Sequence, residues 1–240
     1  MSSSTGLRRF VSGPPSAAQA GAAQNLRPQL PSDQGTESPG QGAIPPTAAE
    51  PEKCEVCATV IPSEHGHLAD LDHSSLVCTC RACYLLFTQR EAVRGRFRAV
   101  PDRYVTDPAH PLTAADWDEL QIPVGLAFFL NSSRAGAVTG FYPSPAGATE
   151  CRLDLAAWAR LADAHPLLKA AEEDVEAVLI TRSPPAGIES FVVPVDACYE
   201  LAGRMRLHWR GFDGGAEARQ AIGALLERVR SRAVRLDQVN

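Results

Sequence analysis

Short apolar segments in the second half of the chain are rich in β-branched and aromatic side chains. Four of them lie at 124–130, 137–143, 176–182 and 189–195. The first two segments flank a stretch of turn-forming residues, and so do the last two, so each pair predicts a β-hairpin.

Other segments carry apolar residues at the spacing of an α-helix. The first covers 153–172, with Asp154 placed to cap its start and Pro166 placed to interrupt it. Two later segments predict helices at 197–210, behind a capping Asp196, and at 217–234. The order ββαββαα predicts the α+β class, as an antiparallel sheet with helices on one face.

Composition divides the chain into three parts. Residues 1–51 hold eight of the nineteen prolines and almost no aromatic or β-branched residues, so we expect a disordered tail. Residues 52–96 are predicted to be a cysteine-rich module, and residues 97–240 the α+β domain. Within the tail, the basic and apolar segment 7–11, "LRRFV", is either a docking motif or ordinary tail.

Charge and hydropathy restrict the setting. A net charge of −5 gives no general reason to expect nucleic acid as a partner. No apolar run approaches the roughly 20 residues of a membrane-spanning helix, so no span is expected. Arg8 and Arg9 are not followed by the apolar segment of an export signal, which favours a cytoplasmic protein. In that reducing compartment a cysteine cluster indicates a metal site in preference to disulfides.

Five of the seven cysteines lie between residues 54 and 83. Cys54 and Cys57 form one C-x-x-C pair, and Cys80 and Cys83 form a second. Two such pairs can place four thiolates tetrahedrally around one metal ion, so we predict one zinc per chain.

The segment between and behind the two pairs predicts the fold around this zinc. Strands are expected at 67–72 and 76–80, and a helix at 83–93. The segment thus contains a knuckle, a hairpin and a helix that begins at the second cysteine pair. This order predicts a small module of the treble-clef or zinc-ribbon type.

Cys78 is the additional cysteine of the cluster. It points to the same side of its strand as Cys80, so either residue could be the ligand, with Cys78 otherwise a free thiol. Structural zinc is favoured, and the alternatives are an iron or iron–sulfur centre and a redox or nickel-transfer site. Three histidines between the pairs are expected on the surface and not as ligands: His65, His67 and His73.

Other candidate residues are arginines that follow the module and aromatic residues in two predicted loops, 141–147 and 208–215. The candidate partner-binding residues are Arg94, Arg96, Arg98, Arg103, Tyr142, Trp209 and Phe212. Nucleic-acid binding by the arginines is an alternative with little aromatic interleaving to support it. No catalytic constellation stands out, which favours a protein that is not an enzyme.

Five longer segments carry a resemblance to a known family. They are "HLADLDHSSLVCTCRACYLLFT", "GRFRAVPDRY", "DWDELQIPVGLAFFLNSS", "FYPSPAGATE" and "FVVPVDACYELAGRMRLHWRGFDGG". Over about residues 52–232 the chain resembles an uncharacterised actinobacterial family, a domain of unknown function, whose genes are commonly found beside subunits of high-affinity nickel–iron hydrogenases. The resemblance implies an accessory or assembly protein with hydrogenase subunits or maturation factors as partners, and it implies no activity or catalytic residue.

The sequence therefore predicts a non-catalytic zinc-binding accessory or interaction protein. A redox or metal-transfer component that uses the five cysteines is one alternative, and a nucleic-acid-binding zinc protein is another. The oligomeric state is not indicated by the sequence.

Overall fold

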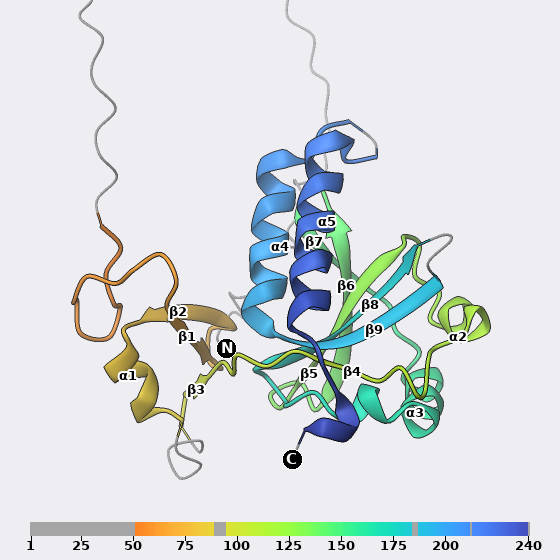
Figure 1. Ribbon diagram of the computed structural model, residues 1–240, viewed down its shortest axis with the longest axis horizontal. Coiled ribbons are helices and arrows are strands. Elements are labelled where there is room, and N and C mark those ends of the chain that lie inside the picture. The colour runs from red at the N-terminus through yellow and green to blue at the C-terminus, as the bar shows by residue number, and fades with distance from the viewer. Residues whose placement is uncertain (1–50, 89–94, 184–186, 212, 240) are drawn as a thin grey trace, which may run out of the picture. The chain divides into compact units, whose positions relative to one another are not determined.

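The computed structural model describes residues 51–88, 95–183, 187–211 and 213–239 (Figure 1). The predicted tail, with its segment "LRRFV", lies outside these residues except for Pro51, and Arg94 and Phe212 also lie outside them. The described residues from Glu52 onward belong to one compact unit.

The cysteine-rich part of the chain forms a small antiparallel sheet and one short helix. The elements are β1 (Gly66–Asp70), β2 (Ser75–Thr79), α1 (Arg81–Leu86) and β3 (Phe97–Ala99), with the strand order β2-β1-β3. The predicted hairpin is confirmed. The helix begins at Arg81 and not at Cys83, because Cys80 is its N-cap and accepts a hydrogen bond from the Cys83 N–H.

A second sheet has seven strands in the order β10-β4-β9-β8-β5-β6-β7. Their bounds are β4 (Val105–Thr106), β5 (Leu126–Ser132), β6 (Ala137–Ser144), β7 (Gly147–Cys151), β8 (Glu176–Ser183), β9 (Gly187–Pro194) and β10 (Val234–Arg235). Both predicted hairpins, β5–β6 and β8–β9, are confirmed. All neighbouring strands are antiparallel except β10 and β4, which are parallel.

Helices connect and cover this sheet. They are α2 (Ala114–Glu119), α3 (Leu155–Ala164), the 3₁₀ turns at Pro166–Lys169 and Leu236–Gln238, α4 (Val195–His208) and α5 (Gly215–Arg232). Asp154 caps α3 as predicted, since its carboxylate accepts hydrogen bonds from two backbone N–H groups. Asp196 was expected to cap α4 and does not, because the helix follows β9 directly with Pro194 at the N-cap.

The helices lie on both faces of the large sheet. Side chains that alternate along the central strands divide between two cores: Phe128 and Leu179 pack with α4 and α5, whereas Phe129 and Val178 pack with α2 and α3. Figure 1 shows α4 and α5 side by side across one face. The predicted α+β class is confirmed. The placement of helices differs from the single covered face that we expected, because α3 packs on the face opposite to α4.

The small sheet is joined to the large one by polar and apolar contacts. The Tyr199 hydroxyl on α4 donates to the Ser74 carbonyl at 2.7 Å, and an Arg98 Nη donates to the Glu173 carbonyl at 2.7 Å. A core of four buried residues also joins the small sheet to the start of α4 and to the residue before β8: Ala69, Val100, Val175 and Val195. The cysteine-rich part is therefore held directly against the start of α4.

Candidate metal centre

Four cysteine side chains meet at one point. The Sγ atoms of Cys54, Cys57, Cys80 and Cys83 all lie within 4.8 Å of one another. The Cys57 and Cys80 Sγ atoms are 3.7 Å apart. A tetrahedral zinc site with Zn–S bonds of about 2.3 Å has sulfur–sulfur separations of about 3.8 Å. The group could therefore hold a metal ion such as zinc with little rearrangement.

Local backbone structure brings the first pair into position. The Cys54 N–H donates to the Thr59 carbonyl at 2.8 Å, and the Ala58 N–H donates to the Cys54 carbonyl at 2.7 Å, which closes a knuckle. Ala58 has a φ of 62°, in the left-handed region that such a turn requires. The knuckle is held to the hairpin because the Glu55 N–H donates to the Cys78 carbonyl at 2.9 Å.

The second pair comes from the end of β2 and the first turn of α1. The Cys83 N–H donates to the Cys80 Sγ at 3.4 Å. The structure thus brings together the two C-x-x-C pairs and includes Cys80, not Cys78, in the four-sulfur group.

The four thiols perturb one another. Burial acts to raise the pKa of Cys54, but hydrogen bonds from backbone groups such as that of Cys80 outweigh it and lower the pKa to about 6. Burial and the neighbouring thiols raise the pKa of Cys83 to about 12. Four negative charges so close together repel, and a divalent cation is the partner that allows all four sulfurs to ionise.

A second group of metal-ligating side chains lies beside the first. Ligand atoms of His65, His67 and Cys78 all lie within 4.8 Å of one another. Of the three histidines expected on the surface, His73 is 55% exposed, whereas the side chains of His65 and His67 are only 7% and 23% exposed. Burial and the carboxylates of Glu52 and Glu55 raise the pKa of the Cys78 thiol to about 12.

The candidate partner-binding arginines make contacts within the chain. Their guanidinium groups reach carboxylates as follows: Arg96 to Asp70, Arg98 to Glu172 and Asp174, and Arg103 to Glu176. Each of these charges is therefore compensated inside the protein, and the described arginines do not form a free cationic stripe.

The two predicted aromatic loops also have internal roles. Residues 141–147 are not a loop but the end of β6, a tight turn and the start of β7, with Tyr142 opposite Thr149. Trp209 follows α4, packs against the larger core and donates its Nε1–H to the Gly211 carbonyl at 3.0 Å.

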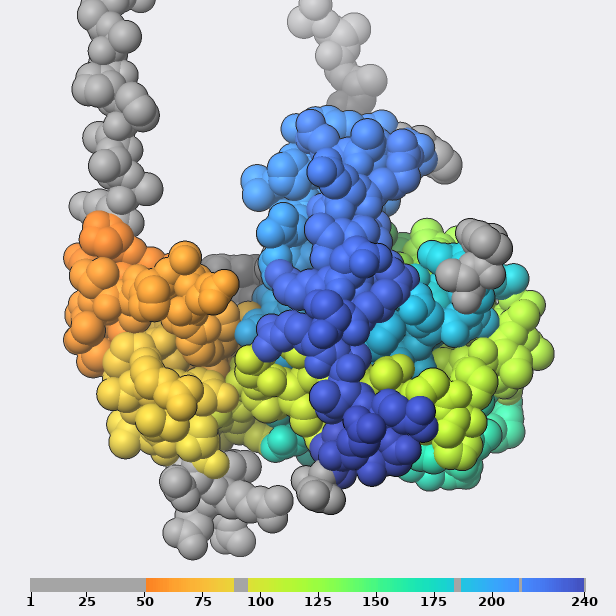
Figure 2. All heavy atoms as spheres, in the orientation of Figure 1, coloured from red at the N-terminus to blue at the C-terminus, as the bar shows by residue number. Residues whose placement is uncertain are grey.

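The cysteine-rich part carries exposed apolar side chains that we did not predict. Of the eight large hydrophobic side chains exposed in the described residues, four belong to the knuckle region and α1: Val56 (49%), Val60 (56%), Leu85 (45%) and Leu86 (67%). This part is orange and yellow in Figure 2.

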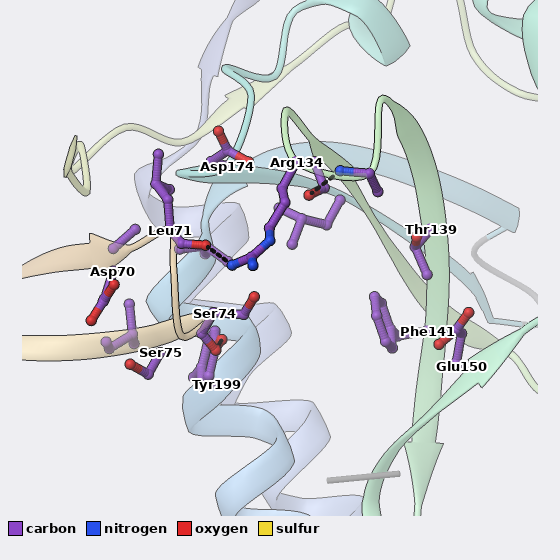
Figure 3. Close-up of a pocket in the computed structure, with 16 residues that line it drawn as sticks. Asp70, Leu71, Ser74, Ser75, Arg134, Thr139, Phe141, Glu150, Asp174 and Tyr199 are labelled. Atoms are coloured by element: carbon purple, nitrogen blue, oxygen red, sulfur yellow. Dashed lines mark hydrogen bonds between the residues drawn. The ribbon is translucent and has the colours of Figure 1, made fainter. Parts of the chain in front are cut away.

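A cavity of about 460 Å³ lies between the β1–β2 turn, the β5–β6 hairpin and α4. Figure 3 shows Arg134 reaching from the hairpin toward the turn, where it donates to the Leu71 carbonyl at 3.3 Å, with Ser74 and Tyr199 on the same side. The hairpin between the two cysteine pairs thus forms one wall of this cavity.

Residues 53–233 match a protein family described as "Family of unknown function (DUF5947)". No curated protein and no solved structure matches the chain. None of the helices in the described residues combines the length and the apolar character needed to span a membrane.

Proposed function

The chain belongs to DUF5947, a family of unknown function, and on this premise we propose that it is a non-catalytic zinc-binding accessory protein that docks onto a protein partner. The observation that carries the proposal is the convergence of four cysteine sulfurs within 4.8 Å of one another: Cys54, Cys57, Cys80 and Cys83. The zinc is held by these four thiolates.

A zinc ion at this site has a structural role. Four thiolates complete the tetrahedral coordination of zinc and leave no position for water or substrate. The apolar cluster around the knuckle contains only Ile61 besides cysteines. A segment with so small a core of its own gains its stability from metal binding.

The folded module presents an apolar surface to a partner. We define the module surface as the side chains of Val56, Val60, Leu85 and Leu86, all exposed in the structure. Half of the large hydrophobic side chains that are exposed in the described residues belong to this one small module, and exposed apolar surface is typical of protein-binding sites. The resemblance of the sequence to a hydrogenase-linked family supplies the proposed partner, a nickel–iron hydrogenase subunit or one of its maturation factors.

The metal is tested by measuring chelator-resistant metal and the visible spectrum after anaerobic purification. We expect one tightly held zinc per chain and no visible absorption, and we expect Cys57→Ser to lose that zinc. Cys151→Ser, which changes a partly buried thiol on β7, is the matched control and should retain it. Iron with charge-transfer bands would support the redox alternative instead.

The docking surface is tested by co-purification with hydrogenase subunits from native cells. Leu86→Glu and Leu207→Glu are a matched pair, because Leu86 is 67% exposed on α1 and Leu207 is 68% exposed on α4. We expect the first variant to lose the hydrogenase subunits and the second to keep them. Equal recovery with both variants would contradict the module surface, and absence of hydrogenase from the wild-type complex would contradict the partner.

A further inference from the structure

The cluster of His65, His67 and Cys78 is built by the hairpin. His67 on β1 lies directly opposite Cys78 on β2 in the strand register, so their side chains share one face of the sheet. The ring of His65 packs against that of His67 with 4.8 Å between the ring centroids. Ligand atoms around one zinc ion are about 3.3–3.6 Å apart for two nitrogens and a sulfur. Small side-chain rotations are enough to bring the three groups onto one ion.

Both histidines are fixed in the tautomer that binds metal through Nε2. The His65 Nδ1 lies 2.9 Å from the Pro62 carbonyl oxygen, and the His67 Nδ1 lies 2.9 Å from Asp196 Oδ2. A carbonyl and a carboxylate only accept hydrogen bonds, so in each neutral ring Nδ1 carries the proton and Nε2 keeps a lone pair. A carboxylate behind a histidine is also the usual outer partner of a metal-binding imidazole.

The His65 Nε2 atom is buried and has no hydrogen-bond partner in the described part of the chain. The side chain is only 7% exposed, so bulk water does not readily satisfy this nitrogen. A buried polar atom without a partner costs about 1–3 kcal/mol, and such atoms commonly mark the position of an ion or an ordered water. The lone pair of His65 therefore points to a bound group.

The surroundings of Cys78 favour a cation. Its Sγ lies 3.6 Å from Glu52 Oε1, and its backbone N–H donates to the Glu55 carboxylate. Two carboxylates therefore lie near the sulfur and the two imidazole lone pairs. This group has more electron-pair donors than hydrogen-bond donors, which favours a bound cation.

We propose that His65, His67 and Cys78 form a second metal site, separate from the four-thiolate group, for a divalent transition-metal ion of the Zn²⁺ type. Two imidazoles and one thiolate suit zinc and cobalt and do not suit magnesium or calcium. This site does not depend on the proposed function, because none of its ligands belongs to the four-cysteine group.

The second site differs from the first in being incomplete. Three protein ligands leave a fourth coordination position, as in zinc sites that bind water or an exchangeable ligand. His65 and His67 line a cleft of about 920 Å³, which Arg228 and Arg232 also line. Arg228 Nε is itself a buried donor without a partner in the described residues. Glu200 and Asp102, which line the same cleft, pair with these two arginines, so the exchangeable ligand is a water molecule.

The test is the metal stoichiometry of the full chain titrated with Zn²⁺, with Co²⁺ as the spectroscopic probe. We expect the wild-type protein to bind two ions, one resistant to a chelator and one removed by it. His67→Gln and Cys78→Ser should each bind one ion, the one that resists the chelator. His73→Gln is the matched control, because His73 lies on the same hairpin, is 55% exposed and should leave both ions in place.

Saturation of the wild-type protein at one ion would overturn the proposal. The partner of the His65 Nε2 atom would then be an ordered water molecule. Two ions that persist in His67→Gln would overturn it as well. If the variants fail to fold, ¹¹³Cd NMR of the wild-type protein still decides, because two resonances, one typical of four thiolates and one typical of a single thiolate, are required. A spectrum that lacks only the four-thiolate resonance would count against the proposed function and not against this second site.

Discussion

Arg103, one of the candidate partner-binding residues, is expected to stabilise the fold through Glu176. The Glu176 side chain is fully buried, and Arg103 is 35% exposed. The Arg103 Nε donates to Glu176 Oε1 at 2.8 Å, a second guanidinium nitrogen donates to Oε2 at 2.5 Å, and the Glu172 N–H donates to Oε2 at 2.8 Å. Arg103→Ala removes two of these three donors and leaves a carboxylate buried with one.

The expected loss follows from the cost of an unpaired buried charge. Removing one partner of a buried ion pair costs about 3–5 kcal/mol. Partial exposure of Arg103 allows water to reach the vacated space, so we expect the lower end, about 3 kcal/mol in the free energy of unfolding. For a chain of this size that corresponds to a fall of about 6–12 °C in Tm.

The assay is urea unfolding followed by tryptophan fluorescence, since Trp117 and Trp158 lie in one core of the large sheet. Arg160→Ala is the control, because it breaks an ion pair with Glu119 at a largely exposed arginine and should change stability far less. Adding Glu176→Gln to Arg103→Ala should recover part of the loss, because a neutral amide is cheaper to bury. A loss below about 1 kcal/mol, or no recovery in the double variant, would refute the reasoning.

Two further predictions concern other parts of the chain. Asp154→Ala should cost about 1 kcal/mol in urea unfolding, because it removes the two hydrogen bonds that cap α3, and Asp154→Asn should cost less. The hydrogen bonds from Arg96 hold the pKa of Asp70 well below its usual range despite burial, with His73 assisting, so this carboxylate contributes stability above its unfolded pKa of about 4 that is lost as pH falls further. Unfolding measured between neutral and acid pH should show a smaller acid-side loss for Asp70→Asn than for the wild type.

Much of the fold could be predicted because the longer elements carry their own pattern. The hairpins β5–β6 and β8–β9 were predicted from apolar segments on either side of turn residues, and α3 was predicted with its cap at Asp154 and the break at Pro166. The short helix α2 (Ala114–Glu119) was missed because six residues are too few to show a helical period. Its capping box between Thr113 and Asp116 was nevertheless visible in the sequence.

The covering of both sheet faces was also signalled in the sequence. Four consecutive residues at the start of β5, Leu126 to Phe129, are buried, and an apolar run without alternation indicates a strand covered on both sides. The prediction that helices cover a single face rested on the order of strands and helices alone and did not use this apolar run. Two-residue strands such as β10 leave no such trace.

The candidate site could be predicted only where its residues lie close together in the sequence. Two C-x-x-C pairs predict a four-thiol group. Whether Cys80 or Cys78 belongs to that group depends on where β2 ends and α1 begins. The surroundings of His67 depend on Asp196, which is 129 positions away in the chain. Contacts at that distance are set by tertiary packing, and no sequence pattern near His67 reveals them.

The span of these contacts along the chain determines the order in which the protein can be completed during synthesis. All four cysteines of the first group have left the ribosome once Cys83 has, and the strand that closes the small sheet, β3, ends at Ala99. The carboxylate that orients His67 arrives with α4, and the pairing of Val234 with Val105 arrives later still. Local contacts form before distant ones. The four-cysteine group is therefore complete while the chain is still being made, whereas the proposed second site takes its final form only after α4 has docked.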